Sequence, residues 1–190
     1  MKMFNKILMA SEFDVNRLKD GYFTKTVEGV KSDAAVEDGA FVSIKGLRAH
    51  DLYAGMKDLN AREITAYDAN EPIFGFVDYV GVSHADVMGV KYRIGDKIAG
   101  VYPTAGEGTR VRIPELADEF YLCDENFDSA NQPDLTSKKY AVPEAGKTTL
   151  KAVSSKPASG FYVEVEDIRD LIMGQVNEGS KMYRCRVMSL

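Results

Sequence analysis

The stretch Asp38-Gly39-Ala40-Phe41-Val42-Ser43-Ile44 decides the fold class, because a turn-forming pair is followed directly by a β-prone run. A turn residue followed by a short β-prone run recurs in Gly95-Asp96-Lys97-Ile98-Ala99-Gly100-Val101-Tyr102 and in Thr109-Arg110-Val111-Arg112-Ile113. Short β-prone runs separated by turn residues are typical of antiparallel sandwiches and barrels. The sequence therefore predicts a mostly β protein, an antiparallel β-barrel or β-sandwich with few short helices.

Strands are expected on both sides of this stretch. Residues 54–61 have the composition of one or two helical turns and interrupt the pattern. The predicted strands cover residues 22–27, 40–45, 62–67, 73–82, 97–102, 109–113 and 119–123.

The last third of the chain predicts a smaller β unit. Residues 128–139 contain almost no apolar side chains, which is typical of a connector. Beyond them, apolar and polar residues alternate over 161–166 and again over 183–187, as in amphipathic strands. A short helix is expected over 167–173, closed by Gly174.

We expect these two strands to pair antiparallel, with Glu164 and Glu166 facing Arg184 and Arg186 on the solvent side. The predicted organisation is a main β domain with an N-terminal arm over residues 1–127, a connector over 128–139 and a small C-terminal β unit over 140–190.

The composition suits a protein with its own hydrophobic core. The chain has 190 residues, 45% of them hydrophobic, enough for one domain or for one domain with an appendage. The formal net charge of −5 argues against nucleic acid as a partner, because phosphate binding needs a cationic surface. No stretch is long and apolar enough to cross a bilayer, and the apolar run at 7–10 is too short for an export signal. We therefore expect no membrane partner.

Cys123 and Cys185 lie far apart in sequence and outside any Cys-x-x-Cys pattern. This usage fits two small buried side chains in a reducing compartment better than a disulfide framework.

Residues 144–148 (Glu-Ala-Gly-Lys-Thr) resemble the end of a phosphate-binding loop. Ala141 replaces the leading glycine of that loop, and Pro143 removes a main-chain amide that the loop would use. We interpret the segment as a simple turn that carries an exposed Lys147.

Two further motifs are incomplete. Residues 124–129 follow the first half of a calcium-binding loop, but Ser129 replaces its glycine and Leu135 its bidentate glutamate. We interpret this segment as an acidic solvated loop. Gly106-Glu107-Gly108 lacks the third glycine of a dinucleotide-binding loop and predicts a hairpin tip.

The chain has two histidines, His50 and His84. Residues 83–86 place a hydroxyl, an imidazole and a carboxylate close in sequence, but adjacent residues of a strand point to opposite faces. We interpret His84 as a surface-loop histidine. The 29 acidic side chains single out no catalytic pair. The sequence predicts no enzymatic activity, no catalytic residues, no cofactor and no metal site.

Residues 36–42 (Val-Glu-Asp-Gly-Ala-Phe-Val), 95–100 (Gly-Asp-Lys-Ile-Ala-Gly) and 183–187 (Tyr-Arg-Cys-Arg-Val) together resemble the small β-rich head-decoration, or cement, proteins of tailed bacteriophages. The resemblance implies an auxiliary capsid protein that sits on the outside of the shell and clamps neighbouring major capsid subunits. It carries over no catalytic residues. It also implies that the protein is made in the host cytoplasm and ends in the virion.

The implied partners are the major capsid protein and other copies of this chain, for which a trimer suits symmetric lattice sites. The apolar residues near the two ends of the sequence either contact such partners or close the protein's own core. These candidate interface residues are Met3, Phe4, Ile7, Leu8, Met182, Tyr183, Met188 and Leu190.

Two alternatives remain open. The first is a non-enzymatic binding module of a phage tail or other assembly that recognises carbohydrate or protein, favoured by a concave groove lined by exposed tyrosines. The second is a small hydrolase or nucleotide-binding enzyme, which requires a deep pocket where His84 or Lys147 meets carboxylates.

Overall fold

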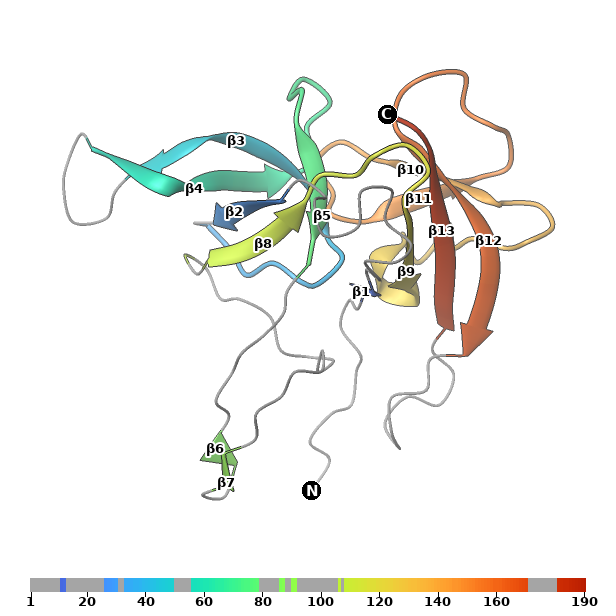
Figure 1. Cartoon of the computed structure of the whole chain (residues 1–190). Coiled ribbons are helices and arrows are strands. Elements are labelled where there is room, and N and C mark those ends of the chain that lie inside the picture. Colours follow the sequence, from blue (N-terminus) through green and yellow to red (C-terminus); the bar gives the residue numbers. More distant parts are fainter. Residues whose placement is uncertain are drawn as a thin grey trace.

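The computed structural model describes residues 11–12, 26–30, 33–49, 56–78, 86–87, 90–91, 106, 108–170 and 181–190. These residues form a closed five-stranded barrel, a six-stranded antiparallel sheet and a separate two-stranded hairpin (Figure 1). The mostly β fold class predicted from the sequence is confirmed.

The barrel follows the order β2-β4-β3-β5-β8 and closes between β8 and β2. The pairing of β2 with β4 is parallel, and the other four pairings are antiparallel. Valine and isoleucine side chains such as Val42, Ile64 and Val111 fill the interior. The strands are β2 (Thr26–Val30), β3 (Phe41–Ala49), β4 (Lys57–Ala66), β5 (Phe74–Val77) and β8 (Gly108–Arg112).

The barrel interior is narrow at Gly29 of β2. A Cβ atom at this position would lie 2.8 Å from the Cγ2 atoms of Ile64 and Val111. A hydrogen atom in place of a side chain therefore lets three strands close on one another.

The pair β3–β4 extends beyond the other barrel strands (Figure 1). The first four residues of β3 are buried, whereas Leu47, further along, is 40% exposed. The helical turns expected over residues 54–61 are wrong over 57–61, because strand β4 begins at Lys57; residues 54 and 55 lie outside the described residues. Pairing with β2 and β3 outweighs the local propensity of this segment.

The six-stranded sheet has the order β1-β9-β13-β12-β10-β11, and all its pairings are antiparallel. A short 3-10 turn, η2 (Asp124–Asn126), follows β9, and the separate hairpin consists of β6 (Asp86–Val87) and β7 (Val90–Lys91). The sheet strands are β1 (Ser11–Glu12), β9 (Glu119–Cys123), β10 (Tyr140–Pro143), β11 (Leu150–Val153), β12 (Tyr162–Asp170) and β13 (Lys181–Ser189).

One hydrophobic cluster joins the barrel to this sheet. Phe41 of β3 and Phe76 of β5 pack against Phe120 of β9 and against Phe161, which precedes β12. The side-chain amide of the buried Asn126 adds a polar link, since it donates to the main-chain oxygen of Asp38 at 3.0 Å. The barrel and the sheet therefore share a core.

The outer edge of β11 is covered by the chain's own residues 127–131. Phe127 forms a parallel bridge with Leu150, and the main-chain N–H of Asp128 donates to the oxygen of Leu150 at 2.8 Å. The N–H of Ala152 in turn donates to the oxygen of Asn131 at 3.0 Å. The predicted connector thus occupies the hydrogen-bonding edge of this strand.

The expected pairing of the two C-terminal strands is confirmed, with one correction to their charges. Glu166 contacts both arginines of β13, Arg186 at 2.8 Å and Arg184 at 3.6 Å. Glu164 is the register partner of Arg186, as expected, but its carboxylate accepts a hydrogen bond from Lys139 at 2.7 Å. The register shifts between Val165 and Asp167, so that the strands do not continue in simple alternation.

Other predicted elements are partly right. The predicted strand 119–123 coincides with β9, whereas 22–27 overlaps β2 only at its end. Residues 167–170 belong to β12, so the helix predicted over 167–173 is wrong over these residues. The rest of that helix and the predicted strand 97–102 lie outside the described residues. Sheet membership runs across the predicted domain division, because β9 pairs with β13; the division itself stays a prediction.

Candidate functional site

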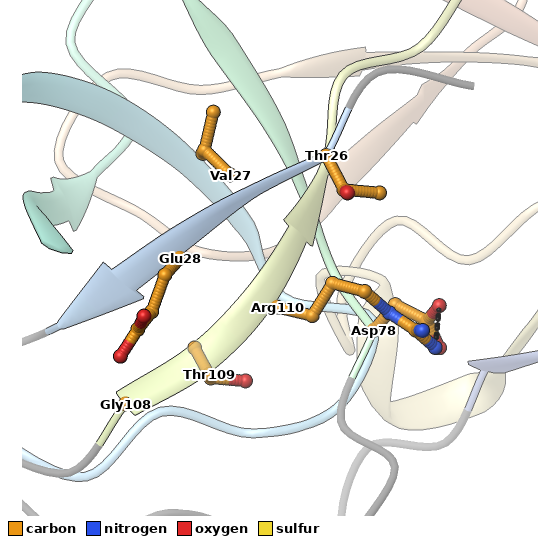
Figure 2. Close-up of a pocket in the computed structure, with 7 residues that line it drawn as sticks. All are labelled: Thr26, Val27, Glu28, Asp78, Gly108, Thr109 and Arg110. Carbon is orange, nitrogen blue, oxygen red and sulfur yellow. Dashed lines mark hydrogen bonds and ion pairs between the residues drawn. The ribbon is translucent and has the colours of Figure 1, made fainter. Parts of the chain in front are cut away.

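A pocket of about 380 Å³ lies beside the antiparallel pair β2–β8. Its volume is within the range of small-molecule and side-chain binding sites. Figure 2 shows the side chains that form it, with the residue after β5 at one side. The described lining residues are Thr26, Val27, Glu28, Asp78, Gly108, Thr109 and Arg110.

Asp78 is a buried carboxylate held by two arginines of β8. Its Oδ2 atom accepts a hydrogen bond from Nη2 of Arg110 at 2.6 Å and another from Nε of Arg112. The side chain of Asp78 is only 2% exposed, and its main-chain N–H donates to the oxygen of Arg110 at 2.9 Å. Two charge-assisted hydrogen bonds to one oxygen fix the position of this buried carboxylate.

Glu28 and Arg110 are direct register partners across β2 and β8. The guanidinium of Arg110 extends toward Asp78 instead of toward Glu28 (Figure 2). The Glu28 carboxylate lies over Gly108, where a Cβ atom would be 2.7 Å from its Oε1. Within the part of the chain that the structure describes, this carboxylate has no hydrogen bond and no ion pair.

Thr109 adds a second polar group without a partner. Thr109 is 4% exposed, and its Oγ1 atom has no hydrogen-bond partner among the described residues. The pocket therefore combines the carboxylate of Asp78, which is paired with two arginines, the unpaired carboxylate of Glu28 and the half-exposed guanidinium of Arg110. Such an arrangement can bind charged and polar groups through fixed donors and acceptors.

The segment that resembles a phosphate-binding loop forms the turn between β10 and β11, as predicted. Gly146 has a φ of 80°, and Nζ of Lys147 lies 3.0 Å from Oε2 of Glu144. The hydrogen bond that Lys147 donates to the Glu144 carboxylate raises the pKa of Lys147. The main chain of this turn also bonds the barrel, since the N–H of Tyr67 donates to the oxygen of Lys147 at 3.0 Å.

In the segment that resembles a calcium loop, three carboxylate oxygens accept hydrogen bonds within the protein. Oδ2 of Asp124 accepts from the main-chain N–H of Lys181 at 2.9 Å, and Asp128 accepts from Asn131 and Ala130. Among the residues that the structure describes, no group of three or more histidine, cysteine and acidic side chains is placed to hold a metal ion.

The structure places the predicted interface residues of β13, and Leu190 directly after it, in different environments. Met182 and Tyr183 are buried in the protein's own core, Met188 is half-buried and Leu190 is 55% exposed. The other candidates, Met3, Phe4, Ile7 and Leu8, lie outside the described residues, as do His50 and His84.

Both cysteines are buried and free, as the sequence predicted. Burial raises the pKa of the Cys185 thiol, which keeps it protonated and unreactive. Gly106, in the predicted hairpin tip, has a φ of 85°.

Sequence reasoning did not find the Asp78–Arg110–Arg112 cluster. The available signal is the spacing of the two arginines, since residues two apart on a strand share a face. Their common acidic partner follows a different strand, β5, and 31 other residues separate Asp78 from Arg110 in the sequence. The pairing of β5 with β8 brings the two segments together.

No known protein family, curated protein or solved structure matches this chain. In the described part of the chain, no helix has the length and apolar character needed to span a membrane.

Proposed function

We propose that this protein is a structural virion protein, one that decorates and stabilises a capsid shell by bridging major capsid subunits. The observation that carries the proposal is the shared aromatic core, in which Phe41 and Phe76 of the barrel pack with Phe120 and Phe161 of the sheet region. A part that holds neighbouring subunits together must not bend between its own contact surfaces. A single packed core that joins both sheets supplies that stiffness.

Exposed apolar side chains occur at separated places on this body. Leu47 and Met56 lie on or beside the projecting β3–β4 pair, and Leu116 and Leu190 lie near β9 and β13. Their exposed fractions range from 40% at Leu47 to 57% at Met56. Contacts at several separated places support bridging, because several weak contacts to one assembly give a high combined affinity.

The charged groups of the pocket also suit binding better than turnover. Asp78 is committed to Arg110 and Arg112, so it is not available as a general base. The described lining residues include no tyrosine, and thus do not form the tyrosine-lined groove that a carbohydrate-binding module would favour. We further propose that the major capsid protein is the partner, that copies of this chain associate with one another and that the protein resides in the capsid.

The test is to mix the purified protein with shells of the same virus that lack it, then measure co-sedimentation and the temperature at which the shells disrupt. We expect saturable co-sedimentation and a higher disruption temperature. Serum albumin at the same concentration serves as the control for trapping in the pellet. Failure to co-sediment, or binding without any rise in disruption temperature, would overturn the proposal.

A further inference from the structure

We propose that the pocket beside β2–β8 is a docking site for a basic side chain, a lysine or an arginine, of the partner subunit, with Glu28 as its acceptor. This inference rests on the proposed function, since the partner subunit is taken to be that of the shell.

The first support is the orientation of two residues that the register places opposite one another. Oppositely charged side chains at such positions of an antiparallel pair ordinarily contact each other across the strands. Here the guanidinium of Arg110 bonds Asp78, and the carboxylate of Glu28 lies over Gly108, in the other direction along β8. The separation leaves the carboxylate open at one wall of the pocket (Figure 2).

The second support is the space that Gly108 provides. A side chain at this position would occupy the place of the Glu28 carboxylate, because its Cβ would be 2.7 Å from Oε1. The glycine therefore lets Glu28 lie against the strand at the pocket wall.

The third support is the balance of charge around the pocket. The two arginines neutralise Asp78, whereas Glu28 has no cationic partner among the described residues. An ammonium or guanidinium group is the complement that this carboxylate accepts. The remaining N–H groups of Arg110, whose side chain is 42% exposed, can donate to a carbonyl or carboxylate oxygen next to that basic side chain on the partner.

The test uses Glu28, because the carboxylate of this residue makes no hydrogen bond or ion pair within the described structure. A change at Arg110 would also remove one of the two arginine partners of the buried Asp78 carboxylate. Glu28→Gln keeps the side-chain size and removes the charge, and Glu28→Lys reverses it. Glu144→Gln and Glu144→Lys, on the β10–β11 turn, are the matched controls. Melting curves of all four variants establish that each is folded.

The readout is the concentration of each protein that half-saturates shells lacking it. We expect about a tenfold weaker affinity for Glu28→Gln, a larger loss for Glu28→Lys and wild-type affinity for both Glu144 variants. Added salt should weaken the wild type more than Glu28→Gln.

Wild-type affinity of a folded Glu28→Lys variant would overturn this inference and leave the proposed function standing. Equal losses for the Glu28 and Glu144 variants would also overturn it, because they would indicate a general effect of charge. If the wild-type protein fails to bind shells, the proposed function falls, and the docking site falls with it.

Discussion

The ring of Phe41, at the start of barrel strand β3, stacks on the ring of Phe161, next to sheet strand β12, with centroids 4.9 Å apart and planes inclined by 24°. The same Phe41 ring also contacts Phe74 and Phe76 of β5. One side chain of the barrel is thus part of the core of the sheet. This contact makes the stability of the two sheets interdependent.

Replacing Phe41 by alanine should lower the free energy of unfolding by about 3–5 kcal/mol, because the buried ring leaves a cavity between the sheets. Urea unfolding followed by circular dichroism and by tyrosine fluorescence measures this change. Both signals should move together in a single transition, in the wild type and in the variant. Two separated transitions, only one of them shifted by the substitution, would contradict a shared core.

Gly29→Ala should destabilise the barrel by about 1–3 kcal/mol, because its methyl group would lie 2.8 Å from Ile64 and Val111. Gly46→Ala is the matched control, since no atom lies within 4 Å of a Cβ placed there on β3. Thermal melting compares the two variants. Equal melting temperatures would show that the interior at Gly29 can expand without cost.

Ala117→Gly should stabilise the protein by about 1 kcal/mol. Ala117 has a φ of 74°, where a Cβ atom is strained and glycine is not, and this relief outweighs the added freedom of glycine in the unfolded chain. Chemical denaturation measures the gain.

Ala130→Gly is the control for Ala117→Gly. Ala130 is exposed and does not have a positive φ, so only the entropic cost of glycine remains and this variant should be less stable than the wild type. If both variants lose stability to the same extent, the strain at Ala117 is negligible.

Glu119 should make the stability of the sheet depend on pH. Burial acts to raise the pKa of Glu119, but the hydrogen bonds and charges of Arg184 and Arg186 outweigh it and hold the pKa below the ordinary 4.5. Because the folded pKa is the lower one, this stabilisation is present above pH 4.5 and is lost as the pH falls through the folded value.

Glu119→Gln should therefore cost about 1–2 kcal/mol at pH 7, and the difference from the wild type should narrow as the pH is lowered. Urea denaturation at several pH values measures both curves. Glu144→Gln, which removes only an exposed pair with Lys147, should run parallel to the wild type. A constant difference for Glu119→Gln down to acid pH would contradict the role of the two arginines.

The alternation of apolar and polar residues along single strands made part of the fold predictable. Val163, Val165, Cys185 and Val187 are all buried, as their spacing two apart indicated, and the predicted strand 119–123 coincides with β9. Pairing between distant segments was not predictable in the same way. The strand that begins at Lys57 exists because β2 and β3 lie on either side of it, and no residue within 54–61 carries that information.

The candidate site depended still more on distant contacts. The two arginines of β8 share a face by simple alternation, but their partner Asp78 reaches them through the pairing of β5 with β8. The open state of Glu28 follows from the direction in which Arg110 turns, which the local sequence does not specify. The incomplete phosphate-binding motif, in contrast, was correctly interpreted as a turn, because Ala141 and Pro143 are visible in the sequence itself.

Residues 127–131 hydrogen-bond to the outer edge of β11, and this affects how copies of the protein can associate. An edge strand with unpaired main-chain groups can pair with the edge strand of another molecule, and repeated pairing of this kind produces fibrils. In this protein residues 127–131 already occupy the edge of β11, so strand pairing with another molecule is blocked at that edge. A neighbouring molecule that contacts this edge must therefore be recognised through side chains, and the protein can be concentrated without chain-to-chain growth through β11.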